Sequence, residues 1–223
     1  MPEQAPAQDP QSGLHPAWLG AASSLQRRLA ESVELLPREV RDLGDLFGLV
    51  RGLLSQAIKD GRLKTSAYAL NGMLKECVHP SARLQKELAK VPLQKDERLR
   101  ILLGAGNADG TRFSEDPSQT AHFVLADGAR LDFSITLREG RQGASLEGYI
   151  FSLTFPGDHP TPPFLRLDMN LSNHRNDLHG LRVHLHPGSN DLQVPVPWMS
   201  LSEVFTFVLY GLPWPERPQH DQA

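Results

Sequence analysis

Histidine, aspartate and arginine side chains gather in one part of this chain, between residues 164 and 197. Four of the nine histidines lie there, together with three arginines and three aspartates. His184 and His186 stand two residues apart in a run of alternating apolar and polar residues that begins at Leu181. Asp168 stands in a second such run, Phe164–Met169. Imidazole and carboxylate groups held together can bind a metal ion or transfer protons.

Alternation with a period of two predicts that both runs are half-buried strands, each with one apolar and one polar face. If the two strands are neighbours, five polar side chains share one face: Arg166, Asp168, Arg182, His184 and His186. The two histidines would stand roughly 6.5 Å apart at Cα, two residues along one strand. The connection between the strands is rich in turn-forming residues and contains His174 and His179.

A metal centre is the first interpretation of this face. His184 and His186 would be ligands together with Asp168 and with one of His174 or His179. Two imidazoles and a carboxylate suit Zn, Fe or Mn, so the implied cofactor is a divalent metal. The spacing is short and common by chance, and it leaves other interpretations open.

Acid–base catalysis without a metal is the second interpretation. His184 and His186 would act as general base and general acid, with Asp168 as the carboxylate that orients them. Arg166 and Arg182 would bind a phosphate and stabilise the charge that develops on it. This set of groups suits the cleavage of RNA, in which the 2′-hydroxyl is the nucleophile, and RNA is then the expected partner.

An ordinary polar sheet face is the third interpretation. A half-exposed sheet needs polar residues on its outer face, and His and Arg are common choices. Asp168 and Arg182 would then form a cross-strand ion pair of little net energy.

The elements around these residues predict an α+β protein. From Ala121 onward, apolar and polar residues alternate with a period of two. The segments His122–Ala126 and Ala129–Arg138 flank an Asp-Gly turn. With the segment Tyr149–Phe155 and the two runs above, this makes an antiparallel meander of about five strands. A C-terminal amphipathic helix beginning near Ser200 would cover its apolar face.

Residues 14–103 are expected to be helical, and 104–119 form a glycine-rich linker to a sheet domain at 120–212. Residues 1–13 and 213–223 are expected to be disordered tails. Leu43, Phe47, Val50, Leu54 and Ala57 form a narrow apolar seam at helical spacing. Such a seam packs on the chain's own sheet, or it binds a protein partner or a second copy of the chain.

Composition narrows the class of protein. The net charge of −3 does not suit a general polyanion-binding surface, and the single Cys77 excludes an internal disulfide and a cysteine-rich zinc site. No apolar run approaches the roughly 20 residues that cross a bilayer. The first residues lack the basic and apolar regions of a secretory signal. We therefore expect a cytoplasmic protein without a membrane segment.

A family resemblance enters through the order of motifs between Leu165 and Leu209. These are Arg-x-Asp at 166–168, scattered histidines, HLHPG at 184–188, VPVP at 194–197 and SLSEVF at 200–205. The succession resembles the small TumE-like bacterial toxins, over about Thr120 to Leu212. The resemblance implies action on RNA and functional roles for four positions, Arg166, Asp168, His184 and His186. The chain is longer than such toxins, is acidic and adds a helical N-terminal half.

The function predicted from the sequence is that of a toxin-like ribonuclease, or a related phosphodiesterase, that uses the histidine pair. The alternative belongs to a different class, a non-catalytic interaction or dimerising protein built on the N-terminal helices.

Overall fold

The computed structural model describes residues 40–77, 82–105, 122–157, 162–174, 176 and 181–211. The predicted tails, most of the glycine-rich linker and His179 lie outside these residues.

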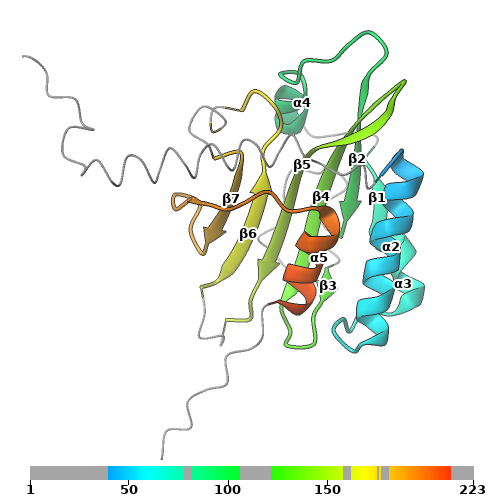
Figure 1. The fold of residues 1–223 in the computed structure, drawn as a ribbon. Coiled ribbons are helices and arrows are strands. Elements are labelled where there is room, and N and C mark those ends of the chain that lie inside the picture. The colour runs from blue at the N-terminus through cyan, green and yellow to red at the C-terminus, as the bar shows by residue number, and fades with distance from the viewer. Residues whose placement is uncertain are drawn as a thin grey trace, which may run out of the picture.

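Helices and strands alternate in the first part of the described chain, and strands dominate the second (Figure 1). The helices are α2 (Leu43–Lys59), α3 (Ala67–Met73), α4 (Ala82–Leu88) and α5 (Leu201–Tyr210). The strands are β1 (Leu74–Glu76), β2 (Arg98–Gly104), β3 (Phe123–Val124), β4 (Arg130–Gly140), β5 (Gly143–Thr154), β6 (Phe164–Met169), β7 (Val183–Pro187) and β8 (Val194–Pro195). Among the described residues, no helix combines the length and the apolar character needed to cross a membrane.

All of these strands belong to one sheet, in the order β1-β2-β4-β5-β6-β7-β8, and each described pairing is antiparallel. Strand β3 pairs with the same strand as β2, beyond the end of β2, so β2 and β3 follow one another along β4. The turn before β4 is the predicted Asp-Gly turn, in which Gly128 adopts a φ of 92° that glycine accepts at little cost. The α+β class, the antiparallel sheet and the C-terminal helix are confirmed.

The predicted strand count of about five was too low, because the described sheet has eight strands. The five expected strands correspond to β3–β7. Strands β1 and β2 lie within residues 14–103, which were expected to be helical. Leu74 and Cys77 match the helical spacing of the preceding residues, but α3 ends at Met73 and Leu74 pairs with Gly104 of β2. Pairing at the sheet edge thus overrides the local helical pattern.

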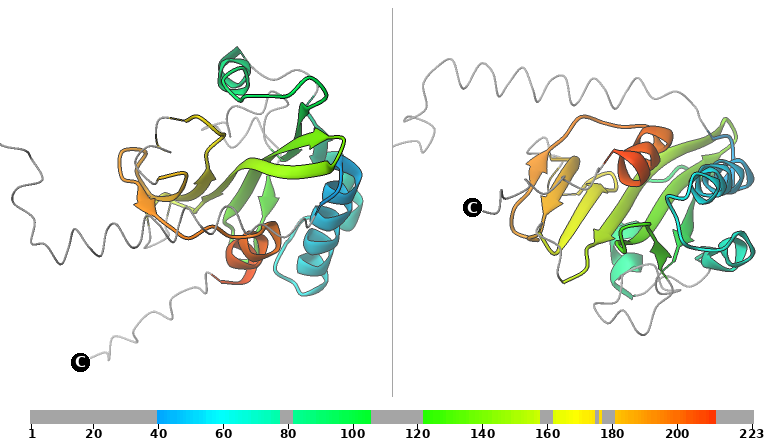
Figure 2. Two further views of the ribbon diagram at one scale, coloured as in Figure 1. Left: turned by 45° about the horizontal axis from the view of Figure 1, so that its top comes forward. Right: turned by 90° about the horizontal axis from the view of Figure 1, so that it is seen from below.

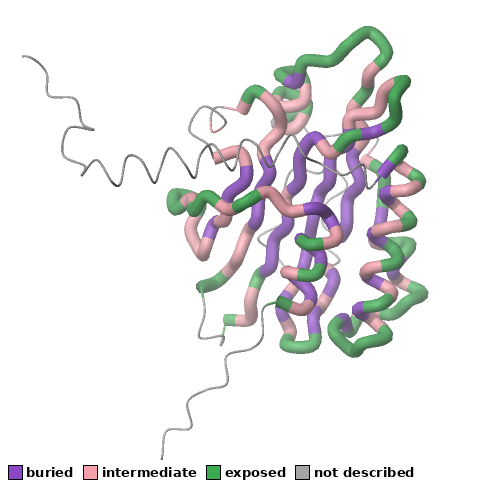
Figure 3. Tube along the Cα trace, in the orientation of Figure 1, coloured by how far each residue is buried: buried purple, intermediate pink, exposed green. Residues whose placement is uncertain are grey.

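The core lies between the sheet and two helices, α2 and α5, which lie side by side over one of its faces (Figure 2). Buried residues follow the central strands, and exposure increases toward the loops (Figure 3). On α2 the fully buried residues are Leu46, Val50, Leu54 and Ala57, and they join the same cluster as the strand residues. Most of the predicted apolar seam therefore packs against the chain's own sheet.

The cap of α5 gives a first testable prediction. Ser200 Oγ accepts from Glu203 N at 3.2 Å, and Glu203 Oε2 accepts from Ser200 N at 2.8 Å, which is the expected capping box. Changing Ser200→Ala should lower the free energy of unfolding by about 1 kcal/mol. Urea unfolding measures this, with Ser202→Ala on the same helix as the control, expected within about 0.5 kcal/mol of wild type.

The same cap predicts a dependence on pH. Hydrogen bonds from Ser200 hold the pKa of Glu203 below its usual value. The Glu203 carboxylate therefore binds a proton more readily in the unfolded chain than in the folded chain. The contribution of Glu203 to stability is present above its unfolded pKa and is lost as the pH falls through its lower folded pKa. The difference in stability between wild type and Ser200→Ala should accordingly shrink in acid, and a constant difference would contradict this account of the cap.

Candidate metal centre

Neighbouring strands β6 and β7 bring the candidate residues together. In their register Asp168 lies opposite His184, and Arg166 lies opposite His186. Leu167 lies opposite Leu185 between these two pairs and belongs to the core on the other face. Four of the five residues predicted to share one polar face therefore share it in the structure.

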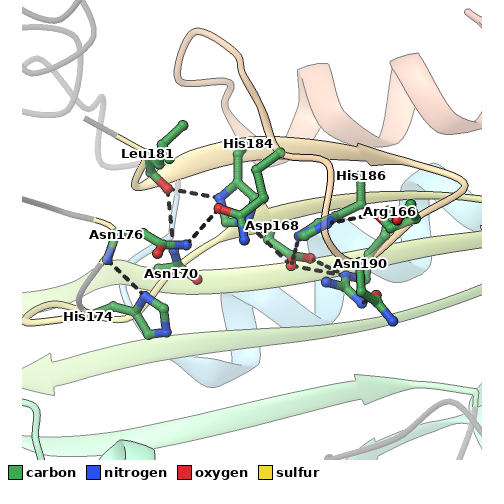
Figure 4. A network of polar contacts seen from close by, with 11 residues as sticks. Arg166, Asp168, Asn170, His174, Asn176, Leu181, His184, His186 and Asn190 are labelled. Atoms are coloured by element: carbon green, nitrogen blue, oxygen red, sulfur yellow. Dashed lines mark hydrogen bonds and ion pairs between the residues drawn. The ribbon is translucent and has the colours of Figure 1, made fainter. Parts of the chain in front are cut away.

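Three potential ligand atoms converge on this face (Figure 4). Asp168 Oδ2 lies 3.3 Å from His186 Nε2 and 3.8 Å from His184 Nε2. The ligand atoms of the three residues all lie within 4.8 Å of one another. This is the one group of three or more potential ligands that the described part of the chain contains.

Backbone carbonyls orient both imidazole rings. His184 Nδ1 donates to Leu181 O at 2.8 Å, and His186 Nδ1 donates to Ser189 O at 3.2 Å. Asn170 Nδ2 donates to the same carbonyl of Leu181 at 3.3 Å. Because Nδ1 of each ring contacts a carbonyl, Nε2 is the nitrogen that faces Asp168. A carbonyl partner of this kind is the usual support of a metal-binding histidine.

Arg166 is the cationic partner of Asp168. Its Nε donates to Asp168 Oδ1 at 3.1 Å and to Oδ2 at 3.0 Å, and its Nη1 donates to Asn190 Oδ1 at 2.8 Å. The ion pair that the third interpretation expected between Asp168 and Arg182 is replaced by this one, because Arg166 on the same strand reaches the carboxylate directly.

Burial sets the protonation state of His184. Both histidine side chains are 2% exposed, Asp168 is 11% exposed and Arg166 is 27% exposed. Burial lowers the pKa of His184, and the nearby Asp168 opposes this only in part. His184 is therefore neutral at pH 7, which is the form that binds a metal ion.

Arg182 lies apart from the three ligand atoms. Its Nη2 donates to Glu147 O at 3.2 Å and to Ser172 Oγ at 3.3 Å. Glu147 is buried, and Arg138 donates to its carboxylate at 2.8 Å. The function of Arg182 seen here is to join the segment before β7 to β5.

Sequence reasoning missed Glu147, although a signal was present. Leu146 and Tyr149 are both apolar but stand three residues apart, which breaks the period of two. The structure has a register shift there, since Thr136 pairs with Gly148 while Leu137 pairs with Leu146. A β-bulge of this kind redirects a side chain. Here it leaves Glu147 as the extra residue between two arginines.

The remaining predicted ligands differ in outcome. His174 Nδ1 accepts from Asn176 N at 3.3 Å, and His174 does not belong to the group of three. His179 lies outside the described residues.

A second histidine–carboxylate pair was also missed. His122 Nδ1 lies 2.6 Å from Asp132 Oδ2, and Asp132 is fully buried. Burial raises the pKa of Asp132, and His122 opposes this in part. Asp132 lies in register with Ser152, which in turn lies in register with Arg166. The polar face thus continues for two strands beyond the metal-ligand group.

No known family model, no curated protein and no solved structure matches this chain.

Proposed function

We propose that this protein binds a divalent transition-metal ion through Asp168 Oδ2, His184 Nε2 and His186 Nε2. The observation that carries the proposal is the convergence of these three atoms from two paired strands, with each imidazole oriented by a backbone carbonyl.

The two distances from Asp168 Oδ2 are compatible with ligands of one ion. A hydrogen bond between nitrogen and oxygen normally spans about 2.7–3.2 Å. With ligand bonds of about 2.1 Å, neighbouring ligand atoms around a tetrahedral ion stand roughly 3.4 Å apart. The two distances from Asp168 Oδ2, 3.3 and 3.8 Å, lie near the second value.

The donor set narrows the choice of ion and leaves room for chemistry. Two imidazoles and one carboxylate suit Zn²⁺, Fe²⁺ or Mn²⁺, whereas Mg²⁺ and Ca²⁺ prefer sites made of oxygen ligands. Three protein ligands leave at least one coordination position open, as in catalytic rather than structural zinc sites. An ion bound there would act as a Lewis acid or activate a water molecule.

Metal analysis of the purified protein tests the proposal. We expect one Zn²⁺, Fe²⁺ or Mn²⁺ per chain after purification or after reconstitution and dialysis. An ion at 100 times its dissociation constant stabilises the folded chain by about 2.7 kcal/mol. For a protein of this size that raises the melting temperature by roughly 5–10 °C. Absence of a bound ion and of any thermal shift with all three metals would overturn the proposal.

The ribonuclease activity expected from the sequence stays a prediction. Nearly complete burial of both imidazoles disfavours the metal-free mechanism, in which the imidazoles contact a phosphodiester directly. Assays of RNA cleavage with and without a chelator distinguish the metal-free mechanism from a metal-dependent one. The alternative, an interaction protein, also stays a prediction. Helix α2 would contribute little to a binding surface, because its central apolar residues are buried in this chain.

A further inference from the structure

Charge balance at the proposed metal site points to a further ligand. This inference rests on the proposed metal binding. Two positive charges from the ion and one from Arg166, less one negative charge from Asp168, leave two positive charges beside neutral imidazoles. Within the described part of the chain, the ion pairs of this group join Asp168 to Arg166, His184 and His186, and no second carboxylate takes part in them. Uncompensated charge in a largely buried place is costly, so an anion is favoured there.

Among the described residues, the carboxylates nearest in sequence and in the sheet do not supply this charge. Asp191 is exposed, and its backbone N donates to Ser189 Oγ in the turn after β7. Asp132 is two strands from Arg166, roughly 10 Å across the sheet, and is paired with His122.

Arg166 offers the place where an anion can bind. Its Nε and Nη1 are engaged by Asp168 and Asn190, and no described residue accepts a hydrogen bond from its Nη2. Its side chain is 27% exposed, against 2% for each histidine. The accessible side of the group is therefore the side of Arg166, where donors for an oxyanion lie next to the carboxylate ligand.

We propose that the metal site binds a small oxyanion, a carboxylate or a phosphate, with one oxygen on the ion and another on Arg166 Nη2. Guanidinium groups match the geometry of both kinds of oxyanion. Burial of the ligand histidines restricts the occupant to a small molecule or to a terminal group. The substrate class of the site is then a small acid or a phosphate ester.

Cobalt-substituted protein provides the test, because the visible absorption of bound Co²⁺ reports changes in its ligands. The full chain loaded with Co²⁺ is titrated with acetate and, separately, with inorganic phosphate. We expect a saturable spectral change with one anion per chain, and the arm that saturates at lower concentration identifies the carboxylate or the phosphate class. Arg166→Gln should weaken anion binding about tenfold or more, because it removes a charge-assisted hydrogen bond.

The affinity for Co²⁺ itself provides an independent readout. Arg166→Gln removes a positive charge beside the ion and also the hydrogen bonds that hold the ligand Asp168, so its anion affinity is compared with that of wild type at a Co²⁺ concentration that saturates both proteins. Arg98→Gln, which changes the net charge equally from the far strand β2, is the control and should leave both affinities unchanged.

The outcomes separate the two proposals. Stoichiometric Co²⁺ with no response to either anion, or with equal anion affinity in Arg166→Gln, overturns the anion site and leaves the metal site intact. Failure of the wild-type chain to bind Co²⁺, Zn²⁺, Fe²⁺ or Mn²⁺ overturns both.

Discussion

We expect His186→Ala to lower the affinity of the proposed site for a metal ion by at least about 100-fold. Loss of a mere supporting partner at a metal site commonly costs 10- to 100-fold, and loss of a ligand costs more. His186 Nε2 is the nitrogen closer to Asp168 Oδ2, at 3.3 Å. The two described histidines outside the group have other partners, since His174 Nδ1 accepts from Asn176 N and His122 Nδ1 lies 2.6 Å from Asp132 Oδ2. Competition with a chromogenic chelator measures the change.

Two further variants make the result interpretable. Asp168→Asn keeps the size of the side chain and removes its charge, so it should also lose metal affinity while the fold persists. His174→Ala is the matched control and should bind metal as wild type does. Equal affinity in wild type, His186→Ala and Asp168→Asn would exclude the three-residue site. Circular dichroism spectra of each variant show whether the sheet has formed.

Phe205→Ala will lower the free energy of unfolding by about 3–5 kcal/mol, the range for truncating a buried phenylalanine. The ring is fully buried and lies between two strand residues. Its centroid is 5.2 Å from that of Phe133 and 4.9 Å from that of Phe151, both with edge-to-face geometry. Contacts of this geometry add to the energy of burial. Denaturant unfolding followed by fluorescence gives the difference.

Thr206→Ala is the control on the same helix, because residue 206 is exposed and its change should remain within about 0.5 kcal/mol of wild type. A loss below 1 kcal/mol in Phe205→Ala would mean that α5 does not pack on the sheet as described. Phe205 lies on the apolar face and the metal ligands lie on the polar face. The metal affinity of the folded molecules should therefore be unchanged in Phe205→Ala. This variant thus distinguishes a loss of stability from a loss of the metal site.

Together these variants address the two faces of one sheet. The apolar face holds α2 and α5 and supplies most of the stability. The polar face carries Asp168, His184 and His186 and, two strands away, the pair His122–Asp132. Because β6 and β7 take part in both faces, burial of Leu167 on one face holds its neighbours Arg166 and Asp168 in place on the other.

Local patterns in the sequence determined the strands β3–β7, the turn at Gly128, the cap at Ser200 and the grouping of Arg166, Asp168, His184 and His186 on one face. Each of these depends on residues close in the chain: a period of two, a turn dipeptide or a spacing of three. The shared face of these four residues then followed from one assumption, that the two strands are neighbours in the sheet.

Only the tertiary structure decided which of these residues touch. Arg182 donates to the backbone carbonyl of Glu147 at the bulge, and Arg166 is the cation that donates to Asp168. Packing of distant segments determines that both imidazoles are buried, whereas the carbonyls of Leu181 and Ser189 that orient them lie only three residues away along the chain. Strands β1 and β2 likewise form because partners far away in sequence accept their hydrogen bonds. Such facts depend on long-range contacts, which the spacing of residues along the chain does not encode.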